Sequence, residues 1–478
     1  MCIALSPCAL LIPESVMRAS YLAFLFVVPL AASTVRIIQT NSAGDDVSII
    51  DPVTNKVVGT ITGIEVNHGV AAAPDGSHYY VSNEGRSTLD VVDTKSLAVI
   101  RHIPLTGRPN NISISKDGRR VYVGIAAAPG AVDVIDTASL ERAKSIPVKG
   151  PVHNTYITPD GKYVVSGSIP SKIITVIDQS TEEPVWSLQM DLGIRPMAFL
   201  ANPDGSTKWI FVQLSGFNGF AVVDFAARKE TNRIKLPELP PGKAPFREGG
   251  NESHGMAVTS DGKILVVNSR LNTAIYFYSL PDLNLMGSTK VGRAPDWVTL
   301  TPDGRTAYVA NAASNSVSVV DIPSMKELTR IPVGEVPKRN ITAILPDSGK
   351  PSQAPASGTS TVALDYETYT KIVEPIFFTK RAGHARCIAC HAAVNSAFRL
   401  QPLPEGSAWT NEQSHINFDS VKRLVNSSNP EKSRLLLHPL AHEAGGDEFH
   451  SGGRQFLSKS DPDWKAMASW AGVKDSQP

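Results

Sequence analysis

The sequence predicts an all-β seven-bladed propeller followed by a small all-α domain. Two observations support this fold class. A unit of about 43 residues with four short, alternating apolar segments recurs between residues 34 and 347. Beyond residue 361 the alternation gives way to apolar residues at helical spacing. With 478 residues, the chain is long enough for two or three domains.

The first 33 residues have the pattern of a secretory signal peptide. Arg18 supplies a basic residue, residues 21–30 form an apolar run, and residues 31–33 (Ala-Ala-Ser) offer a cleavage site. Met17 directly precedes this pattern, so residue 17 is a second candidate for the true start of the chain. A retained anchor is the alternative, but the apolar run is short for a bilayer span. We therefore expect an exported, soluble, periplasmic protein with no membrane span in its mature chain.

The overall charge of the chain is nearly balanced. It contains 46 basic and 45 acidic residues, which gives a formal net charge of +1. This balance provides no electrostatic reason to expect a nucleic acid or an anionic membrane as partner.

The repeat is clearest in residues 301–321, which begin Thr-Pro-Asp-Gly and end Val-Ser-Val-Val-Asp. Successive copies of its Asp-Gly turn lie 42, 43, 44, 57, 42 and 44 residues apart. The Asp residues of these turns are Asp75, Asp117, Asp160, Asp204, Asp261 and Asp303, with a degraded copy at Asp347. Four short alternating segments per unit, separated by turn residues, predict four-stranded propeller blades.

The blade count follows from the two ends of the repeat region. Residues 35–62 supply three strands with no innermost strand before them, whereas residues 341–345 form an innermost strand with no outer strands after it. These two incomplete units complement each other, so we expect the first and last segments to share one blade and close a ring of seven.

The repeat unit resembles the YVTN-type β-propeller repeat. Residues 308–311 (Tyr-Val-Ala-Asn) and 80–83 (Tyr-Val-Ser-Asn) stand where the motif that names this family falls. The resemblance covers about two-thirds of the chain and implies a propeller fold. It implies little about activity, because propellers carry many unrelated functions.

One position in each repeat breaks the apolar pattern, at the start of the predicted innermost strand. Seven residues before the Asp of each turn stand His68, Asn110, His153, Met197, His254, Asp296 and Asn340, with Arg339 beside the last. We expect these side chains to gather at one mouth of the central channel. His68, His153, His254 and Asp296 form a reasonable ligand set for a second transition metal such as copper, zinc or iron. The alternative is a wet, polar mouth in which Asp296 and Arg339 neutralise each other.

The C-terminal domain begins after a linker. Residues 348–361 are rich in Ser, Pro and Gly, and residues 362–478 contain two helical patterns. Residues 366–378 place Tyr369, Ile372, Val373 and Ile376 at helical spacing. Asp461 followed by Pro462 is a strong helix start, with Trp464, Met467 and Trp470 on one face of the last helix.

Between these two helices lies Cys387-Ile388-Ala389-Cys390-His391, the attachment motif of a c-type haem. Cys387 and Cys390 can each form a thioether to one vinyl group, and His391 then reaches the iron as proximal ligand. The other two cysteines lie in the predicted signal peptide, so no second pair remains for a four-cysteine zinc site. A disulfide or a mixed Cys/His metal site is the alternative. We therefore expect a cytochrome c-like domain with one haem c.

The sixth iron ligand has several candidates. The segment from residue 433 to the last helix resembles cytochrome modules of environmental bacteria in which a His-x-Gly-Gly segment precedes the final helix. His450 occupies that position in His450-Ser451-Gly452-Gly453, and the resemblance implies that it is the distal ligand. His438 and His442 are alternatives, as are Met467 and an open position.

Three functions are compatible with this organisation. The first is electron transfer through one haem, with the propeller presenting a redox partner protein or a small-molecule electron donor or acceptor. The second is a periplasmic oxidoreductase with a further metal or cofactor at the channel mouth. The third is a binding or scaffold protein whose haem senses redox state.

Overall fold

The computed structural model describes residues 34–42, 46–64, 66–84, 86–239, 252–334, 336–345, 364–379, 381, 387–392, 398–401, 403, 407–446 and 455–473. The predicted signal peptide, the predicted linker and His450 lie outside these described residues.

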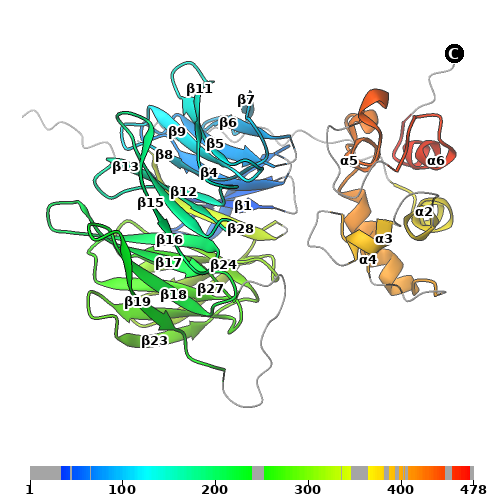
Figure 1. Ribbon diagram of the computed structural model, residues 1–478. Helices are drawn as coiled ribbons and strands as arrows, with labels where there is room; N and C mark the ends of the chain where they lie inside the picture. The colour runs from blue at the N-terminus through cyan, green and yellow to red at the C-terminus, as the bar shows by residue number, and fades with distance from the viewer. Residues whose placement is uncertain are drawn as a thin grey trace, which may run out of the picture. The chain divides into compact units, whose positions relative to one another are not determined.

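Residues 34–345 form seven four-stranded antiparallel sheets, the blades of a propeller (Figure 1). The predicted seven-bladed fold is therefore confirmed. The innermost strands are β4 (Asn67–Ala72), β8 (Pro109–Ile114), β12 (Asn154–Ile157), β16 (Ile194–Ala201), β20 (Ser253–Val258), β24 (Pro295–Leu300) and β28 (Pro337–Leu345). The second strands are β1 (Thr34–Asn41), β5 (His78–Asn83), β9 (Arg120–Ile125), β13 (Tyr163–Ser168), β17 (Thr207–Leu214), β21 (Ile264–Ser269) and β25 (Thr306–Asn311).

The two outer strands of each blade complete the sheets. The third strands are β2 (Asp46–Asp51), β6 (Thr88–Asp93), β10 (Ala131–Asp136), β14 (Ile173–Asp178), β18 (Gly219–Asp224), β22 (Ala274–Ser279) and β26 (Ser316–Asp321). The outermost strands are β3 (Lys56–Thr62), β7 (Val99–Pro104), β11 (Glu141–Pro147), β15 (Glu183–Gln189), β19 (Lys229–Lys235), β23 (Leu285–Lys290) and β27 (Lys326–Pro332). These outermost strands are largely exposed, whereas the third strands are largely buried.

One blade is built from both ends of the repeat region. Its strand order is β28-β1-β2-β3, and β28 pairs antiparallel with β1. In this pairing Ile38 lies opposite Ile341 and Thr34 opposite Leu345. The predicted closure of the ring is confirmed, and the hydrogen bonds between two distant chain segments hold the propeller shut.

The Asp-Gly turns have a common geometry that explains their recurrence. The six glycines from Gly76 to Gly304 that follow the turn aspartates have φ between 68° and 85°, a conformation that favours glycine. The preceding Asp accepts a hydrogen bond from the backbone N–H two residues later, as Asp75 does from Ser77 at 2.9 Å. The turn between the first two strands of these six blades is therefore set by its own residues.

Side chains of the second strands also tie neighbouring blades together. Thr40 of β1 donates to the carbonyl of His68 in β4 at 2.8 Å, and Ser82 of β5 donates to the carbonyl of Asn110 in β8 at 2.6 Å. Such buried hydrogen bonds fix the height of each innermost strand against the next blade.

The helical region is described by itself. Its elements are α1 (Tyr366–Thr368), a π-helical turn η1 (Tyr369–Val373), α2 (Glu374–Phe378), α3 (Cys387–His391), α4 (Asn411–Lys422), η2 (Pro430–Lys432), α5 (Arg434–Leu437), η3 (His442–Ala444) and α6 (Pro462–Trp470). The few helices alone do not establish a cytochrome fold. No helix among the residues placed in the structure is both long and apolar enough to cross a membrane.

Two predicted helices are present in this region. Asp461 caps α6 by accepting from the N–H groups of Asp463 and Trp464, and both predicted tryptophans are buried. The predicted helix over residues 366–378 is interrupted by η1, and Ile372, expected on its buried face, is 49 % exposed. Phe377 is buried instead. The wider π turn rotates the following residues, so the apolar face departs from regular α-helical spacing.

The closing blade provides a test of the fold. Ile38 is fully buried between blades, so Ile38→Ala should lower the free energy of unfolding by about 2–5 kcal/mol through lost burial and a residual cavity. Val58→Ala, in the same blade but 54 % exposed, is the matched control and should change it by less than about 1 kcal/mol. Urea-induced unfolding of the full chain measures both. Equal effects would contradict the packing described for this blade.

Candidate functional site

The innermost strands change register where the predicted polar ring lies. A bulge interrupts the pairing with the second strand between Asn67 and Val70, Pro109 and Ile112, Ile194 and Met197, His254 and Met256, and Pro295 and Trp297. Each of the seven predicted ring positions lies within the first four residues of an innermost strand or directly before it. A bulge redirects the side chains beside it, and bulges are frequent next to active sites. These bulges therefore distinguish the channel mouth from the regular blades.

His68 is held by a carboxylate that the sequence analysis did not identify. Its Nδ1 lies 2.6 Å from Oε1 of Glu84, which follows strand β5. Glu84 also lies 3.4 Å from Nη1 of Arg108. Burial lowers the pKa of His68 and outweighs the opposing effect of Glu84. The contact with the Glu84 carboxylate therefore fixes the orientation of the His68 ring.

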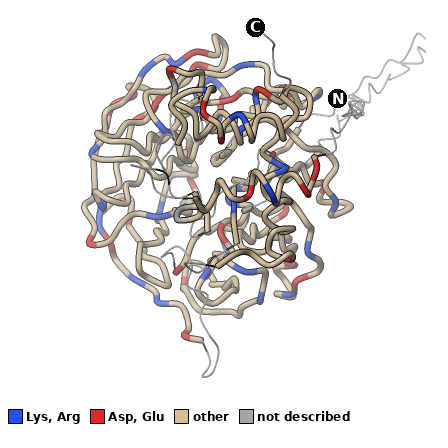
Figure 2. Tube along the Cα trace, turned by 90° about the vertical axis from the view of Figure 1, so that its right-hand side faces the viewer, with Lys and Arg blue, Asp and Glu red and all other residues tan. Residues whose placement is uncertain are grey.

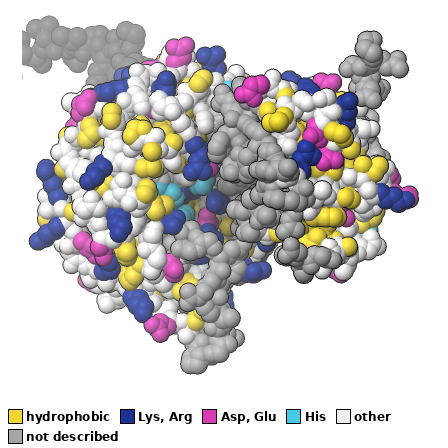
Figure 3. Space-filling view, turned by 45° about the vertical axis from the view of Figure 1, so that its right-hand side comes forward, with side chains coloured by type: hydrophobic (Ala, Val, Ile, Leu, Met, Phe, Trp, Pro, Cys, Tyr) yellow, Lys and Arg dark blue, Asp and Glu magenta, His cyan; other side chains and the backbone are white. Residues whose placement is uncertain are grey.

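His153 and His254 lie beside each other, with ring centroids 6.0 Å apart and an edge-to-face arrangement. Nδ1–H of His254 donates to the backbone carbonyl of Asp296 at 2.7 Å, which makes Nε2 its unprotonated nitrogen. Nδ2 of Asn154 donates to Nδ1 of His153 at 2.5 Å. Burial lowers the pKa of both imidazoles well below the usual value. Both rings are therefore neutral at pH 7, and Figure 3 shows histidines next to basic and acidic groups on this face of the propeller.

Asp296 and Arg339 do not pair as the sequence analysis considered. Asp296 forms an ion pair with Arg270, which follows strand β21. Burial alone would raise the pKa of Asp296, but the positive charge of Arg270 and its neighbours holds that pKa below its usual value. The guanidinium of Arg339 lies over the ring of Trp297, 3.8 Å from its centroid, and Nη2 donates to Asn110 at 3.2 Å. Cation–π contact and one neutral acceptor therefore hold Arg339.

The contacts of His68, His153, His254 and Asp296 can be compared with the metal site predicted at the channel mouth. In the described part of the chain, no three His, Cys, Asp or Glu side chains are grouped so that they could hold a metal ion. His68 is directed toward Glu84 and Asp296 toward Arg270. His254 contacts His153 and also Asp296, whose Oδ1 lies 3.9 Å from Nδ1 of His254. This arrangement gives no support to a metal at the channel mouth.

Some residues at the channel mouth have side-chain partners that share one position of the repeat, directly after the second strand. Glu84, Ser215 and Arg270 each directly follow the second strand of their blade, and they contact His68, Arg195 and Asp296 respectively. The sequence contains a signal that could have identified these partners. Directly after the segment that corresponds to Tyr-Val-x-Asn, two blades carry a charged residue, Glu84 or Arg270, where a small residue is more usual. In three blades, a residue directly after the second strand thus adds to the channel mouth.

The segment predicted to attach haem, Cys387–His391, forms helix α3 in the helical region. Ile388 is buried in the apolar core of that region, and Cys387 packs against the same core. Nδ1–H of His391 donates to the carbonyl of Phe398 at 2.8 Å, and the two rings are 4.4 Å apart. Burial lowers the pKa of His391 to about 4, so its imidazole is neutral with Nε2 unprotonated. Donation from the other ring nitrogen to a carbonyl is typical of histidines that ligate metals, so these residues fit a haem iron.

The candidates for the sixth ligand differ in their surroundings. The structure places His438 directly after α5, close enough to His391 for the two side chains to interact electrostatically. Met467 is buried in the core beside Trp464 and Trp470, as expected for a core side chain. The side chain of His442, like His450, lies outside the described residues.

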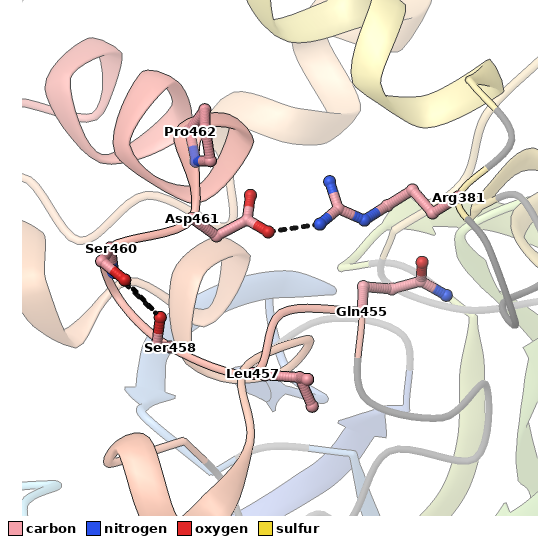
Figure 4. A pocket seen from close by; sticks show the side chains of 7 residues that line it. All are labelled: Arg381, Gln455, Leu457, Ser458, Ser460, Asp461 and Pro462. Carbon is pink, nitrogen blue, oxygen red and sulfur yellow. Dashed lines mark hydrogen bonds and ion pairs between the residues drawn. The ribbon is translucent and has the colours of Figure 1, made fainter.

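A cavity of about 570 Å³ lies beside helix α6 (Figure 4). Its lining consists of Arg381, Gln455, Leu457, Ser458, Ser460, Asp461 and Pro462. Arg381 points to Asp461 and also forms an ion pair with Asp463, while its guanidinium lies over Phe456. These contacts join the segment after α2 to the start of α6, so they are structural in character.

Comparisons with known proteins support the propeller. Residues 132–338 match the family of seven-bladed β-propeller lactonases, and residues 23–154 match the YNCE-like β-propellers. No match was found among curated proteins.

Solved structures give the same fold. The hydrazine synthase of Kuenenia stuttgartiensis is 25 % identical with a TM-score of 0.52, over 59 % of this chain and 91 % of that one. The periplasmic gluconolactonase of Pseudomonas aeruginosa is 19 % identical with a TM-score of 0.53, over 66 % of this chain and 100 % of that one. A putative 6-phosphogluconolactonase of Bacteroides fragilis is 16 % identical with a TM-score of 0.53, over 66 % and 98 %. The chain thus contains a seven-bladed β-propeller similar to those of lactonase and YNCE-like proteins.

The neutral state of His254 predicts a pH-dependent stability. Because its folded pKa lies below the unfolded value, unfolding takes up a proton when the pH falls below about 6.5, and the folded state loses stability. His254→Gln should therefore lose less stability than the wild type between pH 7 and pH 5, by up to about 2 kcal/mol. Urea unfolding at both pH values measures this difference. Met256→Leu, on the same strand without a titratable group, should keep the wild-type dependence; an unchanged dependence in His254→Gln would show that this imidazole is not neutral.

Proposed function

We propose that the protein is an exported c-type cytochrome that transfers electrons through one haem bound covalently to Cys387 and Cys390. In this proposal the propeller presents a redox partner protein or a small-molecule electron donor or acceptor. The observation that carries the proposal is the attachment motif on helix α3, with His391 neutral and oriented by the Phe398 carbonyl. Neutral imidazole with a fixed tautomer is the form in which histidine ligates iron.

When bound, the haem supplies an iron that changes between the ferrous and ferric states. The protein residues provide the surroundings. The Phe398 carbonyl holds the proton of His391 at Nδ1 and fixes the ring plane. Ile388, Phe377 and Leu400 belong to the buried apolar core around α3, which excludes water from this side of the motif and favours the less charged state of a bound group.

Covalent attachment gives the most direct test. In cells that attach c-type haems, the wild-type protein should keep its red colour after acid–acetone extraction, because thioether bonds resist that treatment. Cys387→Ala should lose correctly attached haem, whereas Ala389→Ser, which changes only a spacer residue, should keep it. Colour that acid–acetone removes from the wild type would refute the assignment.

The distal position is proposed for His450. Two imidazole ligands give low-spin iron at a lower potential than a His/Met pair, so the ferric spectrum should lack the weak long-wavelength band of sulfur ligation. His450→Ala should become high-spin while its haem stays attached. A low-spin spectrum that persists in this variant would transfer the role to another group, with His438→Ala as the next variant because His438 lies near His391.

A second candidate function concerns the channel mouth. Neutral His254 presents an unprotonated Nε2 beside His153, an arrangement suited to accepting a hydrogen bond from a bound substrate. In this version the protein is a periplasmic oxidoreductase whose substrate binds at the propeller, and a haem held by Cys387, Cys390 and His391 would exchange electrons with that substrate. Turnover of a substrate that His254→Gln abolishes, with the haem spectrum unchanged, would favour this function over electron transfer alone.

A further inference from the structure

The channel mouth holds more positive than negative charge. Five cationic groups gather here against three acidic ones, namely Arg108, Arg195, Arg270, Lys338 and Arg339 against Glu84, Glu252 and Asp296. The three imidazoles add no further positive charge at neutral pH, because burial lowers the pKa of each. The mouth is therefore positive at neutral pH.

The acidic groups are not available to all of the arginines. Glu84 is engaged by His68 and Arg108, and Asp296 by Arg270. Among the residues that the structure describes, Arg195 and Arg339 form no ion pair: Arg195 donates to the Ser215 hydroxyl at 2.9 Å, and Arg339 donates to the Asn110 side chain. Both acceptors are neutral, so neither guanidinium has a direct ion-pair partner among these residues; Asp296 and Glu84 attract Arg339, and Asp296 and Glu252 attract Arg195, only through space.

Of the two arginines, Arg339 is the more deeply buried and lacks more hydrogen-bond partners. It is only 1 % exposed, and its Nε and Nη1 have no hydrogen-bond partner within the described residues. Burial lowers the pKa of Arg339 only to about 10, and the nearby charge of Arg195 acts in the same direction, so the group remains charged. A buried cation without a counter-charge is costly, and a structure that maintains one usually supplies it with an anion.

The surroundings of Arg339 hold it in one orientation. Trp297 covers one face of its guanidinium. The ring centroids of Trp297 and His254 lie 5.9 Å apart, and those of His254 and His153 lie 6.0 Å apart. The unprotonated Nε2 of His254 can accept a hydrogen bond from a hydroxyl of a bound molecule. Pre-positioned donors of this kind bind oxyanions with little loss of side-chain entropy.

We infer that the propeller mouth is a binding site for a small oxyanion, a carboxylate or phosphate group, with Arg339 and Arg195 supplying its counter-charge. This site is independent of the haem proposal, because it lies wholly on propeller residues. It also specifies the chemical class of the molecule that the propeller would present, namely one with a carboxylate or phosphate group.

Calorimetric titration of the full-length protein at pH 7 and constant ionic strength tests the inference, with inorganic phosphate and acetate as separate probes. At least one probe should bind saturably, and the probe that does so identifies phosphate or carboxylate chemistry. Arg339→Gln and Arg195→Gln should each weaken that binding by about tenfold or more, the effect expected for loss of a charge-assisted contact. Arg330→Gln is the matched control, since Arg330 lies on the outermost strand β27 and pairs with Glu327.

Two results would overturn the inference: no saturable binding of either probe by the wild type, or wild-type affinity in folded Arg195→Gln. If Arg339→Gln fails to fold, Arg195→Gln alone decides, because Arg195 is only half-buried. The Cys387→Ala variant separates this site from the haem: anion binding that persists without attached haem supports the propeller site, whatever the outcome for electron transfer.

Discussion

Pairing between the first and the last strand of the propeller is the interaction on which the other features depend. β1 and β28 lie about 300 residues apart in the chain, yet share one sheet. A propeller that is closed in this way has innermost strands of nearly equal height, and the hydrogen bonds between neighbouring blades maintain that height. Only then can single residues from seven blades converge at one mouth.

Burial, more than proximity, determines the chemistry of that mouth. The same desolvation that keeps His153 and His254 neutral leaves Arg339 charged, because a guanidinium holds its proton far more tightly than an imidazole does. Cationic neighbours hold the pKa of Glu84 and of Asp296 below its usual value, so these two carboxylates stay ionised. Basic and acidic residues are otherwise interspersed along the chain (Figure 2), so the local excess of positive charge is not a property of the protein as a whole.

The repeat made the fold predictable, and the reasons are local. Asp-Gly turns and alternating strands impose their geometry through backbone conformation, which adjacent residues determine, so seven blades and their closure could be deduced. The ring positions could be found for the same reason. Their partners could not, because Glu84 and Arg270 contact ring residues through side-chain directions that the bulges set. Ile372 was misplaced since a π turn interrupts the helix. The motif at Cys387 identifies itself by spacing alone, whereas the distal ligand depends on tertiary contacts.

The bulges at the innermost strands separate the residues that stabilise the blades from residues that form the channel mouth. The blades are stabilised by apolar side chains further along each strand, while the residue at each bulge contributes chiefly to the mouth. Positions outside the apolar clusters, such as His68 and His254, can therefore be exchanged without repacking the apolar core of their blade, whereas Met197 belongs to that core. Mutational drift can thus alter what the mouth recognises in small steps at low cost in stability. A propeller of this construction is consequently a ready scaffold for engineering new small-molecule recognition, one blade at a time.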